Sequence, residues 1–205
     1  MAKPKCKICR RLGTVLFEKC RKIMAKKAYP PGQRGKKRPR GLSEYGRELQ
    51  EKQKLRNLYN LQEKQFKNYV KEILEKKGGI TDASDFLIRT LETRFDNVIY
   101  RMGLASSRAQ ARQLVSHSHF LINGKPVNIP SYQLKKGDKI SARQGFLKTS
   151  FFQNILPGLK KYQPPSWLKL SFDKQNLEAE IIGVPSLKEA APPAEISAIF
   201  EYYSR

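Results

Sequence analysis

Three cysteines, all within the first twenty residues, are the side chains of this chain best suited to binding a metal. Cys6 and Cys9 are separated by two residues, and Cys20 follows after ten more. The first spacing is typical of zinc knuckles, but a closed structural zinc site needs four ligands. No further cysteine or histidine occurs before His117, and Glu18 would be an unusual ligand. A zinc-bound and a metal-free segment both stay open, and we expect that no cofactor is required.

The same segment carries most of the positive charge. Residues 1–40 contain 15 Lys and Arg and one acid, for a net charge of +14, whereas the other 165 residues carry +9. So one-sided a run favours contact with nucleic acid over a merely solvated tail. Residues 29–35, with the sequence YPPGQRG, suit neither helix nor strand because two prolines fix the backbone. They predict either a stiff turn that presents cations to phosphates or an interdomain linker, and the two are compatible.

A second group of polar residues lies in the middle of the chain. Ser107 and Gln110 form a capping box, which predicts a helix to about residue 116. Arg108 and Arg112 stand four apart and therefore share one face of that helix. Asn123-Gly124, between short apolar segments, is a strong hairpin signal. Two short helices that lead into a small antiparallel sheet predict a compact RNA-binding module.

The elements that must position these residues follow from apolar periodicity. A helix is expected from Ser43 to about Tyr59, with a second over residues 66–74. A continuous helical stripe runs from Leu91 to Met102. Strands are expected at 167–172 and 177–182, and a helix follows Pro192-Pro193. The apolar positions of the first helix are Tyr45, Leu49, Leu55 and Leu58.

Composition excludes several classes of protein. The 205 residues carry a net charge of +23 with a pI near 10.1. No apolar run approaches the roughly 20 residues that span a bilayer, and the N-terminus lacks the apolar region of a secretion signal. We therefore expect a cytosolic protein that binds a polyanion, with no membrane partner. The odd number of cysteines and the cytosolic setting argue against a disulfide framework.

Residues 91–143 resemble the RNA-binding domain named after the fourth protein of the small ribosomal subunit. That domain also occurs in pseudouridine synthases, tyrosyl-tRNA synthetases and small stress proteins. The rest of the chain resembles the ribosomal protein family itself, of the bacterial or organellar type. The motifs that carry this resemblance are YPPGQRG at 29–35, LSEYGRELQEKQKLRNLY at 42–59, EKQF at 63–66 and FEYYSR at 200–205.

The resemblance implies an α+β fold in which the RNA-binding module, short helices packed on an antiparallel sheet, is inserted into a helical domain. The expected divisions are a basic arm at 1–42, a helical domain at 43–90, the module at 91–155, and a segment at 156–205 whose strands and final helix return to the helical domain.

The implied function is that of a structural constituent of the small ribosomal subunit, in the cytoplasm or in an organelle. The family binds small-subunit (16S-type) rRNA early in assembly, at a helix junction of its 5′ domain. It neighbours small-subunit proteins five and three, affects decoding accuracy, and borders the channel through which mRNA enters, where Lys37, Arg38 and Arg40 would be the matching cations. We expect no DNA partner.

The residues expected to contact RNA are cations and hydrogen-bonding groups of the arm, the first helix and the module. His117 and His119 could equally be structural. The full set is Arg10, Arg11, Lys22, Tyr29, Gln33, Arg34, Lys36, Lys37, Arg38, Arg40, Arg47, Lys54, Arg56, Ser107, Arg108, Gln110, Arg112, His117, His119, Asn123 and Lys125.

Two departures and two alternatives accompany this interpretation. Some family members carry four N-terminal cysteines and zinc, whereas this chain has three, and Arg34 stands where the family usually has His. An enzyme would need a separate catalytic domain, and about 60 residues after 143 are too few. A zinc-dependent DNA-binding regulator would need a complete metal site and a recognition helix tied to it, and the arm has neither.

Overall fold

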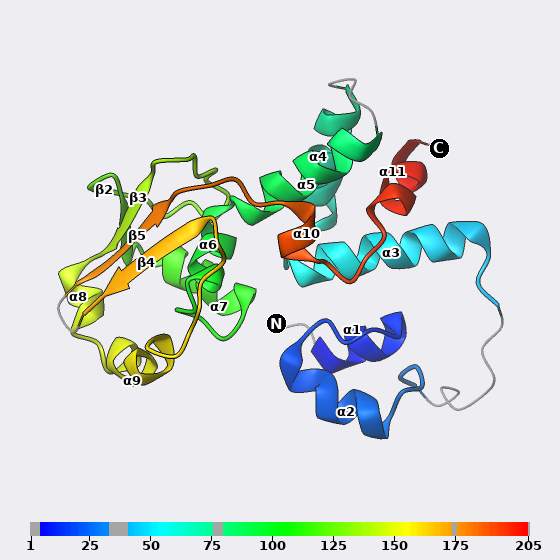
Figure 1. The fold of residues 1–205 in the computed structure, drawn as a ribbon. Coiled ribbons are helices and arrows are strands. Elements are labelled where there is room, and N and C mark those ends of the chain that lie inside the picture. The colour runs from blue at the N-terminus through cyan, green and yellow to red at the C-terminus, as the bar shows by residue number, and fades with distance from the viewer. Residues whose placement is uncertain (1–4, 33–40, 76–79, 174–175, 205) are drawn as a thin grey trace. The chain divides into compact units, whose positions relative to one another are not determined.

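The computed structural model of the chain describes residues 5–32, 41–75, 80–173 and 176–204 (Figure 1). The chain divides into two compact units, Met1–Ser84 with Ala191–Arg205 and Asp85–Ala190. The first is helical and the second combines helices with an antiparallel sheet, which confirms the α+β class. Within the described ranges, no helix combines the length and the apolarity that crossing a bilayer requires.

The N-terminal part of the first unit folds around its cysteines. Helix α1 (Lys5–Leu12), the 3-10 turn η1 (Glu18–Cys20) and helix α2 (Arg21–Lys26) enclose a small core. The buried members of that core are Cys9, Leu12, Leu16 and Cys20.

The rest of the first unit consists of α3 (Glu44–Leu58), α4 (Glu63–Glu75) and α11 (Ile196–Ser204). The Ser43 side chain accepts a hydrogen bond from the Gly46 amide, which caps α3 as the sequence predicts. Helix α11 packs on α3 and α4, although some 120 residues separate it from α4 (Figure 1). The first unit is therefore discontinuous in sequence.

A buried lysine joins α3, α4 and α11. Lys52 Nζ lies 2.6 Å from Glu63 Oε1 and 4.2 Å from the centre of the Tyr202 ring. The Tyr203 hydroxyl donates to the same Glu63 oxygen at 3.0 Å. The sequence predicts an apolar stripe that includes Tyr45, but α3 exposes Tyr45 and buries Lys52 instead. Lys52 can be buried because a carboxylate and two aromatic rings surround its ammonium.

In the second unit, the stripe expected over residues 91–102 is divided between two helices. Helix α5 (Ile80–Glu92) ends before Arg94, and α6 (Phe95–Arg101) begins after it. Arg94 is extended because its backbone bridges to Gln133, and the Phe95 amide donates to the Tyr132 carbonyl at 2.9 Å. Apolar spacing alone does not reveal this break.

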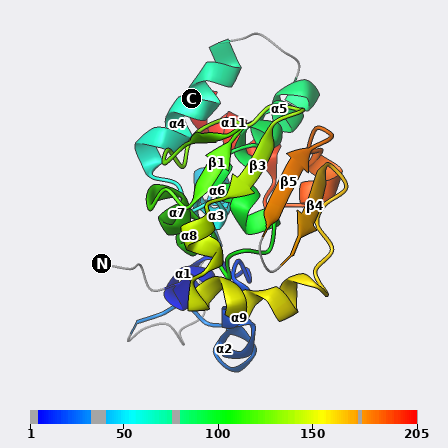
Figure 2. The ribbon, with the colours of Figure 1, turned by 90° about the vertical axis from the view of Figure 1, so that its left-hand side faces the viewer.

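The sheet has the order β2-β1-β3-β5-β4 with every neighbouring pair antiparallel, and Figure 2 shows β1, β3, β5 and β4 side by side. Its strands are β1 (Phe120–Ile122), β2 (Lys125–Pro126), β3 (Lys139–Ala142), β4 (Leu168–Phe172) and β5 (Leu177–Ile181). Asn123 and Gly124 both have positive φ, which forms the predicted tight turn between β1 and β2.

The remaining helices of the second unit are α7 (Arg108–Ser116), α8 (Gln144–Leu147), α9 (Ser150–Leu159) and α10 (Leu187–Ala190). The segment 156–205 is thus divided. Strands β4 and β5 complete the sheet of the second unit, whereas α11 packs on the helices of the first.

One buried carboxylate connects α5, α6 and α7. Glu92 is 1% exposed and accepts from Arg101 Nη2 at 2.7 Å and from Asn97 Nδ2 at 2.8 Å. Arg108 Nη2 lies 3.9 Å away, and Arg108 Nε donates to Asn97 Oδ1 at 2.7 Å. Burying a carboxylate is tolerated only where such partners surround it.

We predict that Glu92→Gln lowers the free energy of unfolding of the second unit by about 3 kcal/mol, because it leaves buried guanidinium charge without a counter-charge. The chain has one tryptophan, Trp167, which is 4% exposed in the core of this unit. Its fluorescence during urea denaturation therefore reports this unit. Glu178→Gln, at an exposed site of the same unit, should change stability by less than about 0.5 kcal/mol. Equal effects of the two substitutions would contradict the structural role of Glu92.

Candidate nucleic-acid interface

Helix α7 is held at its first turn by two side chains. Ser107 Oγ accepts from the Gln110 amide at 3.4 Å, as expected of an N-cap. Gln110 Oε1 accepts instead from the backbone amide and the hydroxyl of Ser106, both at 2.8 Å. In a regular capping box the Gln110 side chain would bond back to the Ser107 amide. Here it bonds to Ser106, one residue earlier, and this bond fixes the orientation of the Gln110 side-chain amide.

The two arginines expected on one face of α7 have different surroundings. Arg108 is 11% exposed, takes part in the Glu92 cluster, and lies over the Tyr100 ring at 4.6 Å. Arg112 is 40% exposed, and its Nη1 lies 3.8 Å from Asp96 Oδ2. Arg108 thus positions the helix, while Arg112 is available to an external phosphate.

Asp96 links Arg112 to a second buried ion pair. Its two carboxylate oxygens accept from Arg94 Nε at 3.1 Å and from Arg94 Nη2 at 3.0 Å. Arg94 and Arg112 therefore share one acid. The guanidinium of Arg112, which is the more exposed of the two, can also contact solvent or a ligand. Glu92 is shared in the same way, by Arg101 and Arg108.

His117 and His119 follow α7 and lie beside α8. Their ring centres are 5.8 Å apart, and the His119 ring is 5.0 Å from that of Phe146. Burial, together with the positive charges of His117 and Arg143, lowers the pKa of His119. His119 is half-buried against the core, whereas His117 is exposed. Of the two, His117 is the better placed to reach a ligand.

Asn123 and Lys125 lie on the same hairpin but have different surroundings. Asn123 Nδ2 donates to Asp138 Oδ1, and Asn123 Oδ1 accepts from the Lys139 amide, each at 2.9 Å. Asn123 therefore fixes the turn to the next strand. Lys125 on β2 is exposed, and no ion pair is present for it within the described ranges.

In the first unit, Arg10 and Tyr29 bind each other. Arg10 Nε donates to the Tyr29 carbonyl at 3.0 Å, Nη2 donates to the Pro30 carbonyl at 3.3 Å, and the guanidinium lies 4.7 Å from the Tyr29 ring centre. These contacts attach the start of the YPPGQRG motif to α1. The guanidinium and ring therefore form a pair that a base could extend by stacking.

The other expected cations of the first unit fall into two classes. Lys54 pairs with Glu51 at 2.6 Å, and Arg56 Nε lies 3.5 Å from Glu63 Oε2, so both are engaged within the unit. Three others are exposed and form no ion pair among the described residues, namely Arg11, Lys22 and Arg47. Six expected residues lie outside the described ranges: Gln33, Arg34, Lys36, Lys37, Arg38 and Arg40.

Sequence reasoning missed a second set of exposed cations. Arg143 borders His119, whose carbonyl accepts from the Arg143 amide at 2.9 Å. Lys148 follows α8, and Lys160 and Lys161 follow α9; all are exposed. They stand singly or as one pair, so no long basic run marks them, and the arm and the capping box gave the stronger signals.

The sequence-based expectation that the cysteines form no disulfide is wrong. Cys6 and Cys20 form a disulfide, contrary to the argument from their odd number, because η1 brings Cys20 to α1 with a Cα–Cα distance of 5.3 Å. Cys9 is free and buried. A disulfide offers no thiolates, and the described residues contain no group of three Cys, His, Asp or Glu arranged to hold a metal. Glu18 pairs with Arg21 instead. This donor set does not fit a structural zinc ion.

The lowered pKa of His119 gives a pH-dependence. The neutral ring is favoured in the fold, so its stability contribution is present above the unfolded pKa of about 6.5 and is lost as pH falls below it. We predict that the free energy of unfolding of the second unit decreases between pH 7.5 and 5.5, and that His119→Gln makes this decrease shallower. Trp167 fluorescence measures both. Identical slopes for the two proteins would contradict the assignment.

Comparison with known proteins identifies the family. A family model described as the ribosomal protein S4/S9 N-terminal domain matches residues 1–92, and one described as the S4 domain matches residues 93–140. Small ribosomal subunit protein uS4 of Natranaerobius thermophilus is 43% identical over 208 residues, covering 98% of this chain and 97% of that protein. The protein of the same name from Chlorobium phaeovibrioides is 43% identical over 199 residues, covering 97% and 96%. That of Roseiflexus castenholzii is 42% identical over 202 residues, with the same coverage. Because these matches extend over both units, the chain belongs to the uS4 family of small-ribosomal-subunit proteins.

Proposed function

We propose that this protein binds small-subunit ribosomal RNA of the 16S type at a helix junction of the 5′ domain, and that it does so early in ribosome assembly. The observation that carries the proposal is the excess of exposed cations. Arg11, Lys22, Arg47 and Lys125 are exposed without an ion pair in the described ranges, in a chain of net charge +23. An excess of this size requires a polyanion to neutralise it.

Membership of the uS4 family makes this protein a structural ribosomal protein and not an enzyme. Its mechanism is therefore positioning. Two rigid units carry cations that neutralise phosphates where RNA helices converge. Side chains cannot enter the deep major groove of A-form RNA, so the shape of the junction and the spacing of phosphates determine recognition.

The protein acts within the small subunit, in the bacterial cytoplasm or in an organelle. We extend the proposal to its neighbours by family resemblance: small-subunit proteins five and three adjoin it, and mRNA passes it on the way to decoding, whose accuracy it influences. The cations that would line the mRNA channel, Lys37, Arg38 and Arg40, lie outside the described residues.

The first test is the salt dependence of binding to a protein-free 5′-domain fragment of bacterial small-subunit rRNA. About 8 phosphate contacts predict a slope near −6 in a plot of log affinity against log salt concentration. Filter binding across about 50–300 mM KCl measures this slope. A slope shallower than about −2 would show that the positive charge is mostly solvated surface.

A variant pair locates part of this charge. Arg112→Ala should weaken binding at every salt concentration and make the slope shallower by about 1, with stability nearly unchanged. Lys188→Ala removes a cation from the acidic C-terminal region, in an exposed position on α10, and should leave affinity unchanged. Equal effects of the two variants would remove α7 from the interface.

We also propose that RNA binding requires no metal, since the donor set of the cysteine segment is incomplete. Elemental analysis of protein purified with a thiol reductant should give well below one zinc ion per chain, and a chelator should leave RNA affinity unchanged. One zinc ion per chain together with loss of binding on chelation would make the cysteine cluster a metal centre.

A further inference from the structure

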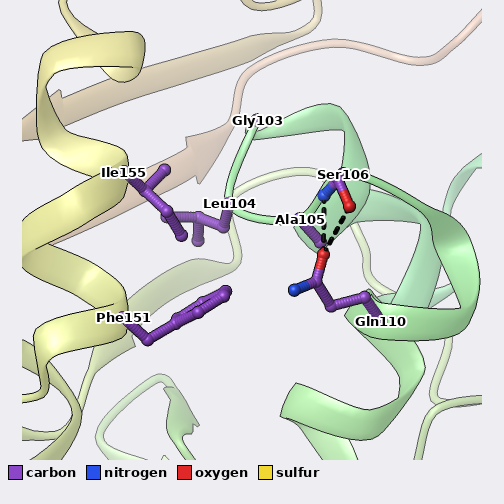
Figure 3. Close-up of a pocket in the computed structure, with 7 residues that line it drawn as sticks. All are labelled: Gly103, Leu104, Ala105, Ser106, Gln110, Phe151 and Ile155. Carbon is purple, nitrogen blue, oxygen red and sulfur yellow. Dashed lines mark hydrogen bonds between the residues drawn. The ribbon is translucent and has the colours of Figure 1, made fainter.

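A pocket of about 260 Å³ lies in the second unit between the turn after α6 and the face of α9. Figure 3 shows Phe151 and Ile155 projecting from α9 toward Leu104, with Gln110 and Ser106 on the opposite side. Leu104 is fully buried, and Phe151 and Ile155 are half-buried. One wall is therefore aliphatic and aromatic, and the facing edge is polar.

The polar edge offers donors in a fixed direction. Gln110 Oε1 accepts from the Ser106 amide, which can only donate, so the oxygen and nitrogen of the side-chain amide are assigned without ambiguity. The Nε2 group then points across the pocket toward Phe151 (Figure 3). Among the described residues the structure gives it no acceptor. Two N–H donors next to an aromatic face form the binding surface of the pocket.

Gly103, which lines the pocket, packs against the Tyr162 ring. Gly103 has φ +78°, and a Cβ there would lie 2.9 Å from the Tyr162 ring, so only glycine permits this turn. The Tyr162 hydroxyl donates to the Arg101 carbonyl at 2.9 Å, which fixes the ring. Lys160 and Lys161, which immediately precede Tyr162 in the sequence, are exposed.

We propose that this pocket accepts one unpaired RNA base. The base stacks on Phe151, and the Gln110 amide donates to a carbonyl oxygen on its edge. Guanine, uracil and cytosine carry such a carbonyl, whereas adenine presents an amino donor at the corresponding position and is disfavoured. Phosphates on either side of the base face Lys160 and Lys161. Unpaired bases stacked on aromatic side chains and read along their edges are the usual means of sequence-specific RNA recognition.

This inference rests on the proposed RNA binding, and its test separates the two. Affinity is measured for protein-free bacterial small-subunit rRNA with wild type, Phe151→Leu and Phe151→Tyr. Stacking on an aromatic ring is worth about 1–3 kcal/mol, so Phe151→Leu should weaken binding at least about 5-fold with the salt slope unchanged, while Phe151→Tyr should restore affinity. Trp167 fluorescence verifies that each variant is folded.

Gln110→Glu removes the two donors but keeps an oxygen for Ser106, so α7 keeps its cap. It should weaken binding more than Asn154→Glu, which adds the same charge at an exposed position of α9 outside the pocket. Chemical probing of the rRNA should show one guanine, uracil or cytosine that wild type protects and both pocket variants leave reactive. If wild type binds and the pocket variants bind as tightly, or if the lost protection is at an adenine, the inference is wrong. If wild type itself fails to bind, the proposed function fails.

Discussion

The structure depends on a shortage of carboxylates, because a small number of acids must form ion pairs with many Lys and Arg side chains. The chain has 18 acids for 41 Lys and Arg, and two of its buried acids, Glu92 and Asp96, each contact two arginines. Glu92 does this most completely, because its two oxygens contact side chains from α6 and α7 while its backbone ends α5. In the first unit Lys52, Arg56 and Tyr203 converge on Glu63, although this acid is 45% exposed. Among the described residues the buried acids are Glu48, Glu92 and Asp96, so the positive surface arises mainly from the excess of 41 Lys and Arg over 18 acids.

This arrangement divides the basic residues into two functional kinds. Arg94, Arg101 and Arg108 are placed among acids and aromatic rings, and they fix helix positions. Arg112 and Lys125 are more exposed, and Arg112 lies on α7, the helix that Arg108 links to Glu92. A flexible Lys or Arg side chain loses conformational entropy when it binds a phosphate. A preorganised scaffold reduces the total loss, because the backbone that carries the side chain is already ordered. The exposed cation of α7 therefore depends on the ion pairs that hold this helix in place.

Much of the fold could be predicted from local patterns, because capping and turn chemistry are encoded within a few residues. Ser43, Ser107 and Asn123-Gly124 all form the predicted structures. The break at Arg94 could not be foreseen, since it depends on a backbone bridge to Gln133, nearly forty residues away. For the same reason the sequence could not distinguish buried Arg108 from exposed Arg112, because both satisfy one spacing rule and differ only in the distant acids they meet. The disulfide between Cys6 and Cys20 likewise arises from the packing of η1 against α1, which counting cysteines cannot reveal.

The return of α11 to α3 and α4 determines the order in which the protein can fold during its own synthesis. Translation delivers α3 and α4 first, and α11 follows only after some 120 further residues. At about 5–20 residues per second, this interval lasts on the order of ten seconds. Throughout it, the side chains that α11 will cover, including Lys52 and Phe66, have no partner from that helix. The second unit, Asp85–Ala190, is synthesised during this interval and is complete in sequence only at Ala190, six residues before α11 begins. The helical pair of the first unit therefore stays open while nearly the whole second unit is made, and it can close only after α11 has been made.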